Sequence, residues 1–191
     1  SEKRNLDLQK FQLAVENASD HIVITDNEGL ILYANPAVER ITGFAPSEII
    51  GKKAGNKELW GGLMDLPFYQ LLWNTIKSDK KVFAGEVNNR RRNGEKYVAL
   101  ASISPVVGKD GSVSYFVGIE RDVTKEKEID RMKTEFISLA SHQLRTPLSA
   151  MKWFGEMLLH GDAGVLSTDQ KEMVGNIYSS NERMIELVNS L

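Results

Sequence analysis

The stretch Ser141-His142-Gln143-Leu144-Arg145-Thr146-Pro147-Leu148 lies inside a long helical pattern and decides how the second part of the chain folds. His142 lies two residues from both Ala140 and Leu144, so it is expected to point roughly opposite the apolar stripe of that helix. Thr146, one turn later, is expected to point the same way. The stripe itself consists of Ile129, Met132, Phe136, Leu139 and Ala140, followed by Leu144, Leu148, Met151 and Leu158.

Pro147 removes a backbone donor from this helix and is expected to bend it just past the histidine. The polar side of the helix would then present an imidazole, a guanidinium and a hydroxyl group to a visiting partner. For a lone histidine, a solvent-facing position without function is the ordinary interpretation, so the choice depends on the residues around His142.

These eight residues resemble the H-box of sensor histidine kinases, because His, Leu, Arg, Thr, Pro and Leu all fall at the spacing of that family. The resemblance implies that His142 is the phosphoacceptor and that Thr146 helps to orient water for removing phosphate from the receiver. The family usually has Glu or Asp after the histidine, whereas this chain has Gln143, which can orient the imidazole but cannot act as a base. Arg145 either meets phosphate charge or lies on a solvated helix face.

Composition describes an ordinary globular protein and excludes several classes of site. The 191 residues are 41% hydrophobic, 26% charged and 8% aromatic, with a net charge of -2. We therefore expect no nucleic-acid partner, and we interpret the one basic run, Arg90-Arg91-Arg92, as a solvated turn flank. Without cysteine there is no disulfide or thiolate metal site, and no metal is expected. No apolar run is long enough for a membrane span. The sequence fits a cytoplasmic location and leaves open a membrane anchor before Ser1.

The part of the chain up to residue 124 alternates strand-like and helix-like patterns. Residues 1–18 predict a helix with a mixed apolar face. Asn35 is expected to cap a helix that Pro36 begins and Gly43 ends. Five strands are expected at 21–25, 30–34, 82–88, 96–106 and 113–122, with the turns Asn93-Gly94 and Asp110-Gly111 between the last three, and further helices at 46–50 and 67–79.

This order predicts an α+β domain, a five-stranded antiparallel sheet with helices on one face. Residues of about 10–124 resemble a Per-Arnt-Sim (PAS) sensor domain, for which we set the boundaries 19–124. The fragments that carry the resemblance are Asp26, Gly29, Asn35-Pro36-Ala37, Gly43-Phe44, Glu48-Ile49-Ile50-Gly51, Arg92-Asn93-Gly94 and Asp122-Val123-Thr124.

The resemblance implies a cavity between the sheet and the helix at 67–79, which in the family holds haem, flavin or a small metabolite. Without cysteine, thiol-flavin chemistry is not expected, and without histidine at 67–79 neither is haem. His21, at the start of a strand, is expected to be structural, and the ligand stays unknown. Four aromatic residues either line the cavity or, as the more ordinary alternative, fill a core: Trp60, Phe68, Tyr69 and Trp73.

Thr124 can cap the long helix, whose residues 125–138 predict a coiled-coil linker from the spacing of their apolar positions. Residues 139–191 predict a helical hairpin: the first helix ends near His160-Gly161, and Ser167 with Gln170 forms a capping box for the second. The second helix has its own stripe, and one hairpin cannot cover both stripes. A homodimeric four-helix bundle can, as the resemblance also implies. The second stripe is Met173, Ile177, Met184, Val188 and Leu191.

No Gly-rich nucleotide-binding stretch is present, so ATP and Mg²⁺ are expected on a separate catalytic domain of the parent kinase. The resemblance implies that His142 receives the γ-phosphoryl group of ATP from that domain and passes it to an aspartate of a response-regulator receiver domain. The fragment alone is expected to be inactive. Two alternatives stay open: a phosphotransfer-only protein, and a non-catalytic dimeric binding module built of a PAS domain and a coiled coil.

Overall fold

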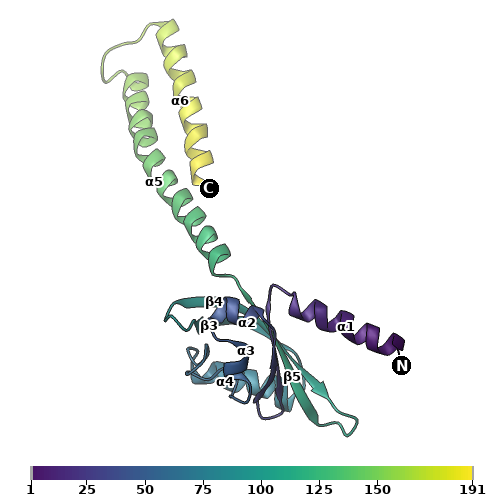
Figure 1. The fold of residues 1–191 in the computed structure, drawn as a ribbon. Coiled ribbons are helices and arrows are strands. Elements are labelled where there is room, and N and C mark those ends of the chain that lie inside the picture. Colours follow the sequence, from purple (N-terminus) through teal and green to yellow (C-terminus); the bar gives the residue numbers. More distant parts are fainter. Residues whose placement is uncertain (1, 191) are drawn as a thin grey trace. The chain divides into compact units, whose positions relative to one another are not determined.

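The computed structural model of the chain describes residues 2–190, with side chains described from residue 4 onward. The chain forms two compact units, Ser1–Glu126 and Lys127–Leu191, and Figure 1 labels most of the elements of both. The predicted first residue of the N-terminal helix, Ser1, and the last residue of the second apolar stripe, Leu191, lie outside the described residues.

The first unit contains a five-stranded antiparallel sheet, which confirms the predicted fold class. The strand order β2-β1-β5-β4-β3 places the first and last strands side by side in the middle (Figure 1). Gly94 and Gly111 of the two predicted turns have φ angles of 90° and 79°, a left-handed conformation that glycine adopts without strain. The strands are β1 (His21–Asp26), β2 (Ile31–Ala34), β3 (Phe83–Arg90), β4 (Lys96–Val107) and β5 (Val113–Asp122).

Asn35 does not cap the helix that follows it, so that prediction is wrong. Helix α2 (Ala37–Thr42) begins without a side-chain cap. The buried amide of Asn35 instead accepts a hydrogen bond from the N–H of Ile22 at 2.9 Å and donates to the carbonyls of Val15 and Asp20, both at 3.0 Å. Three backbone groups satisfied inside the fold outweigh a single helix cap.

Helix α1 (Glu2–Glu16) precedes the sheet and ends close to the residue it was predicted to reach. Its carbonyl at Val15 is held by Asn35, which joins the end of α1 to the start of the sheet. Its large apolar side chains are exposed, as expected of a helix that pairs with a further surface: Leu6, Leu8, Phe11 and Leu13.

The helix predicted at 67–79 is in fact two segments, α4 (Leu66–Trp73) and the π-helical turn η1 (Asn74–Ser78). Asp65 caps α4 by accepting a hydrogen bond from the N–H of Phe68 at 3.0 Å. The short α3 (Pro46–Ile49) matches its prediction. The change from α to π geometry was not foreseen, since no residue pattern in this stretch marks it.

Two groups of apolar residues fill the first unit. The larger group joins the strands to α2, α3 and the loop before α4, and the smaller joins α4 and η1 to the sheet. Residues of both groups line one cavity, described below. The larger group is Val23, Ile31, Ala34, Val38, Ile49, Leu59, Trp60, Tyr97 and Ala99, and the smaller is Leu72, Ile76, Phe83 and Phe116.

The second unit is an antiparallel hairpin of α5 (Thr124–His160), which begins in the first unit, and α6 (Thr168–Asn189). The first helix ends at the predicted residue, and the helix is continuous through Pro147. The predicted capping box is confirmed: Ser167 Oγ accepts from the N–H of Gln170 at 3.3 Å, and the Gln170 side chain accepts from the N–H of Ser167 at 2.9 Å.

The hairpin buries only part of its two apolar stripes. Leu148 and Val188 are buried between the helices, whereas Phe136 keeps 72% of its surface exposed. Packing within one hairpin therefore leaves a long apolar surface open. The other exposed members are Ile129, Met132, Leu139, Leu144 and Met151 on α5, and Met173, Ile177 and Met184 on α6.

Candidate functional site

His142 lies on an exposed face of α5, and no described residue forms a hydrogen bond or ion pair with it. Gln143 and Thr146 are exposed as well, so three of the predicted site residues are open to a partner. The hydroxyl of Ser141, directly before the histidine, is buried without a partner. The imidazole is therefore free to meet a reagent brought by another protein.

Arg145, the fourth predicted site residue, is engaged with the second helix. One of its guanidinium nitrogens donates to Asn189 Oδ1 at 3.2 Å, although the side chain remains exposed. Arg145 would have to leave Asn189 to contact a phosphoryl group on His142. The sequence alone did not predict this partner, because the two residues are 44 positions apart.

Asn181 of α6 joins the helices just past Pro147. Its amide donates to the carbonyl of Leu148 at 2.8 Å, and the side chain is only 2% exposed. Since Pro147 has no N–H, the carbonyl four residues earlier loses its usual donor, and the helix is weakest here. A cross-helix hydrogen bond next to this point fixes the hairpin close to His142.

A second set of polar contacts fastens the hairpin further from the histidine. Lys152 forms an ion pair with Glu182, and the hydroxyl of Tyr178 donates to Glu156 at 2.8 Å. Gly155 makes room for this arrangement, because a Cβ at that position would lie 3.1 Å from the ring of Tyr178. These contacts define which faces of α5 and α6 meet.

The first unit contains a cavity of about 450 Å³ between the sheet and α4 with η1. This volume lies within the roughly 300–1,000 Å³ of sites for small organic ligands. The aromatic residues for which the sequence left two alternatives line this cavity, and three of them, Trp60, Phe68 and Trp73, also belong to the core groups or pack against them. The fourth is Tyr69.

One end of the cavity is polar, with side chains from β1, from β5 and from β3, which lies beyond β4 in the sheet. His21 and Glu120 are directly paired across β1 and β5, and Asn89 of β3 donates to Glu120 Oε2 at 2.9 Å. The indole of Trp60 lies beside the same carboxyl group and, like Asn89, favours its ionised form. Burial lowers the pKa of His21 to about 3 and raises the pKa of Glu120 to about 7. His21, which was predicted to be structural, is buried and also lines the cavity.

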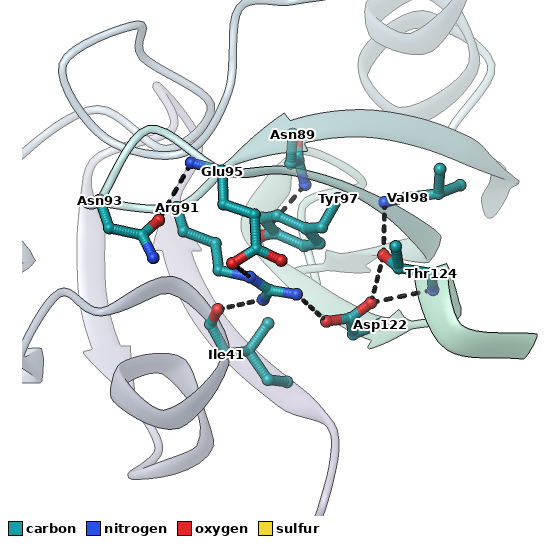
Figure 2. Close-up of polar contacts among 9 residues, drawn as sticks. All are labelled: Ile41, Asn89, Arg91, Asn93, Glu95, Tyr97, Val98, Asp122 and Thr124. Carbon is teal, nitrogen blue, oxygen red and sulfur yellow. Dashed lines mark hydrogen bonds and ion pairs between the residues drawn. The ribbon is translucent and has the colours of Figure 1, made fainter. Parts of the chain in front are cut away.

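From this polar end, contacts continue to the start of α5 (Figure 2). Asn89 donates to the Tyr97 hydroxyl at 3.4 Å, and the Arg91 guanidinium lies 4.5 Å from the centre of the Tyr97 ring. Arg91 also donates to the carbonyl of Ile41 and to Asp122 Oδ2, the latter at 2.6 Å. The interpretation of Arg90-Arg91-Arg92 as a solvated flank therefore fits the exposed Arg90 and is wrong for Arg91.

Asp122 connects this cluster to the first residue of α5. Its Oδ1 accepts from the N–H and the hydroxyl of Thr124, at 3.0 and 2.7 Å, and the same hydroxyl accepts from the N–H of Val98 (Figure 2). Burial by itself would raise the pKa of Asp122, but hydrogen bonds from Thr124 and Arg91 bring it below its usual value. The start of α5 is thus fixed by an ionised carboxylate.

Sequence reasoning missed Glu120 and Asn89 as cavity residues. The alternation of side chains along a strand could have identified them, since Phe116 and Gly118 precede Glu120 at every second position and lie on the same inner face of β5. A charged residue at the end of such an inward series indicates a polar group in the interior. Among the residues whose side chains are described, 4–190, no cluster of His, Asp or Glu is placed to hold a metal ion, and no described helix is long and apolar enough to cross a membrane.

Comparison with family models separates the chain into the same two parts. Residues 19–125 match the PAS domain model, and residues 132–191 match the His Kinase A (phospho-acceptor) domain model. The first match alone covers more than half of the chain. The chain belongs to the PAS domain family. With the phosphoacceptor match, it contains the sensor and phosphoacceptor portions of a two-component sensor histidine kinase.

Similar proteins align with all or nearly all of this chain and are longer than it. Sensor protein kinase WalK of Staphylococcus epidermidis is 29% identical over 195 residues, which cover 100% of this chain and 28% of WalK. Hybrid signal transduction histidine kinase L of Dictyostelium discoideum is 29% identical over 195 residues, which cover 96% of this chain and 11% of that protein. This chain therefore spans only a small part of the length of these relatives.

Solved structures agree with the PAS fold of the first unit. An RNA-binding light-oxygen-voltage receptor has a TM-score of 0.61 and 26% identity, over 70% of this chain and 38% of that one. The PAS domain of a Colwellia psychrerythraea protein has a TM-score of 0.52 and 21% identity, over 62% of this chain and 98% of that one. The second comparison concerns the fold alone.

Proposed function

We propose that His142 is the phosphoacceptor of a two-component sensor histidine kinase and that the PAS unit controls its phosphorylation. The observation that carries the proposal is the exposure of His142, without a partner among the described residues, inside the segment that matches the phosphoacceptor domain. A histidine presented in this way can be reached first by a catalytic domain and then by a receiver domain. The proposal places the chain in the cytoplasm, where ATP is available.

The chemistry is nucleophilic phosphoryl transfer. A nitrogen of the neutral His142 imidazole attacks the γ-phosphorus of ATP, a P–N bond forms, the bond to the bridging oxygen breaks, and ADP leaves. The proton of the attacking ring goes to solvent. A receiver aspartate carboxylate then attacks the phosphorus, the P–N bond breaks, and His142 is restored. ATP and Mg²⁺ are held by the catalytic domain of the parent kinase.

Three neighbours support these steps in the proposal. Gln143 orients the imidazole through its side-chain carbonyl, but it brings no negative charge and accepts no proton. Thr146, exposed one turn after His142, orients water when phosphate is removed from the receiver. Arg145 exchanges its hydrogen bond with Asn189 for one to the phosphoryl group.

The proposal includes a homodimer. Exposed apolar residues run from Ile129 to Met151 on α5 and from Met173 to Met184 on α6. A second hairpin would cover both stripes in a four-helix bundle, while the polar face with His142 stays open. A dimer interface on these stripes would explain why a single hairpin buries so few of its apolar residues.

Sensing would reach α5 through the cluster of Arg91 and Asp122. A change at Glu120 alters the hydrogen bond of Asn89, and through Tyr97 it alters the position of Arg91. We further propose that the cavity holds neither haem nor a thiol-reactive flavin, since the chain has no cysteine and α4 and η1 have no histidine. A Soret band in the absorbance spectrum of protein purified with haem supply would contradict this.

The test is radioactive labelling of the chain by the catalytic domain of its parent kinase, supplied separately with [γ-³²P]ATP. The label is expected to be acid-labile, as phosphoramidates are, and to disappear in His142→Gln. His160→Gln is the matched control, because His160 is also an exposed histidine of α5.

Each outcome separates the alternatives. Acid-labile label on wild type and on His160→Gln, but not on His142→Gln, supports the proposal. No label on a folded wild-type chain would favour the non-catalytic binding module. Label that comes only from a phosphorylated receiver domain, and never from ATP, would favour a phosphotransfer-only protein.

A further inference from the structure

Glu120 is a carboxyl group in the interior of the PAS unit without a cationic partner. Its side chain keeps 16% of its surface, on the wall of the cavity, and no Lys or Arg among residues 4–190 forms an ion pair with it. Its neighbours are neutral groups, the amide of Asn89, which donates a hydrogen bond to it, and the indole of Trp60. Burying a carboxylate without a counter-ion is costly, so a natural protein rarely keeps one without a use.

A second polar group beside it also lacks a partner. His21 is 1% exposed, and its Nδ1 has no hydrogen bond, although it lies 3.9 Å from Glu120 Oε2. The ring of Trp60 meets the imidazole edge to face, with 4.7 Å between the centroids. A neutral imidazole nitrogen and a carboxylate both accept hydrogen bonds, so this end of the cavity can receive a donor.

The rest of the cavity is apolar and open enough for an organic body. Phe68, Trp73 and Phe116 line it, and the ring of Trp73 meets that of Phe116 at 5.9 Å. The sheet contributes a flat floor at Gly118, where an added Cβ would meet nothing closer than a carbonyl oxygen at 3.8 Å. An aromatic or aliphatic group of moderate size fits such walls.

We propose that this cavity binds a small organic cation, an amine with an apolar or aromatic body, whose ammonium group lies against Glu120 and whose body lies among the aromatic residues. The inference rests on the proposed role of the PAS unit as sensor and names the chemical class of its ligand. The ammonium group would supply the positive charge that Glu120 lacks. Its remaining N–H groups would donate toward His21.

Other ligand classes fit this cavity less well. An anionic ligand would meet the buried carboxyl group of Glu120, while Lys53, the one lysine among the lining residues, is exposed to solvent. A neutral ligand would leave Glu120 without a counter-ion. Because the favourable term is charge neutralisation away from water, selectivity for the cation over its neutral isostere is expected to be strong.

The experiment is isothermal titration calorimetry of the full chain with three amines of increasing size: benzylamine, phenethylamine and tryptamine. Each is paired with its neutral alcohol, and tryptamine also with indole-3-propionate. At least one amine is expected to bind about tenfold or more tightly than its alcohol, and indole-3-propionate is expected not to bind. No amine binding at millimolar concentration, or equal binding of amine and alcohol, would overturn the proposal.

Two variants assign the binding to this cavity. Glu120→Gln keeps the shape and is expected to abolish the preference for amine over alcohol, whereas Glu58→Gln, at an exposed loop position, is expected to keep it. Gly118→Leu fills the cavity from its floor and is expected to abolish binding. Amine binding that survives both cavity variants in folded protein would contradict the proposal. Since no step involves phosphate, failure here is distinguishable from failure of labelling at His142.

Discussion

The two units of this chain place their polar and apolar groups in opposite ways. The PAS unit buries His21 and Asn89 and half-buries Glu120 around a cavity, whereas the hairpin leaves apolar residues such as Phe136 exposed along both helices. A cavity with one polar end suits a small molecule, and an exposed apolar stripe suits another protein surface. The same chain therefore has one unit suited to a ligand and one suited to a second copy of itself.

The largest effect is expected from breaking the apolar stripe. Phe136→Glu places a charge where the proposal buries an aromatic ring, and it is expected to weaken dimerisation about a thousandfold, or about 4 kcal/mol. Thr134→Glu adds the same charge at a position two residues away, on another face of α5, and is expected to leave the dimer intact. Sedimentation equilibrium measures both. A wild-type monomer at micromolar concentration, or equal effects of the two variants, would contradict the dimer.

A substitution of Glu120 tests the polar interior of the PAS unit. The pKa of Glu120 is raised from 4.5 to about 7 by burial, so its stabilising contribution is complete below pH 4.5 and is lost as the pH rises through 7. Glu120→Gln removes the ionisable group, so the variant does not lose this stability as the pH rises. At one pKa unit per about 1.4 kcal/mol, the variant is expected to be more stable than wild type at pH 8 by on the order of 3 kcal/mol, and by little at pH 4.

The measurement is urea unfolding of the PAS transition in both proteins from pH 4 to 8. His21 and Tyr97 are the titratable groups that face Glu120, with Lys53 on the same cavity. The lowered pKa of His21 acts in the opposite direction below pH 6.5, but both proteins carry it, so it largely cancels. A stability difference that does not change with pH would show that Glu120 titrates normally.

A substitution of Arg91, which lies near the end of the contacts that lead from the cavity to α5, is expected to have a smaller effect on stability. Arg91→Ala removes the hydrogen bonds to Ile41 and Asp122 and is expected to destabilise the PAS unit by about 2 kcal/mol. Arg90→Ala, at the exposed neighbour, is expected to cost about 0.5 kcal/mol or less. Thermal unfolding compares the two variants, and equal values would mean that the Arg91 cluster adds no stability.

The smallest effect concerns Gln143. If the absence of a carboxylate limits proton removal from the imidazole, Gln143→Glu is expected to raise the initial rate of His142 labelling about tenfold, less than the roughly hundredfold or more that a positioned base contributes, because solvent also accepts the proton. Labelling rates of both proteins across pH measure this. An unchanged or lower rate with Glu would leave Gln143 as an orienting group only.

Local patterns predicted most of the fold. The five strands, the turns at Gly94 and Gly111, and the capping box at Ser167 follow from residues that are close in sequence, and the structure has them all. The role of Asn35 was mispredicted, because its partners lie up to 20 residues away and a cap is the nearest local alternative.

The sequence predicted one candidate site and missed the other, because only the first is encoded by residues that are close in sequence. The exposed residues around His142 were identified by a short motif, and their roles stay predictions, as does the division of α5 into linker and hairpin at residue 139. The polar end of the cavity was not predicted, since Glu120 and Asn89 meet only when β3 and β5 enter one sheet. Long-range contacts such as Asn181 with Leu148 leave no local pattern.

The most direct test of the account is to locate the phosphate itself. The chain has three histidines, of which His21 is buried in the PAS unit and His160 is exposed at the end of the same helix as His142. After phosphorylation by the parent catalytic domain, mass spectrometry of peptides kept at neutral pH is predicted to find phosphate on His142 and on neither of the other two. Phosphate on His160, or none on a folded and dimeric chain, would contradict the account.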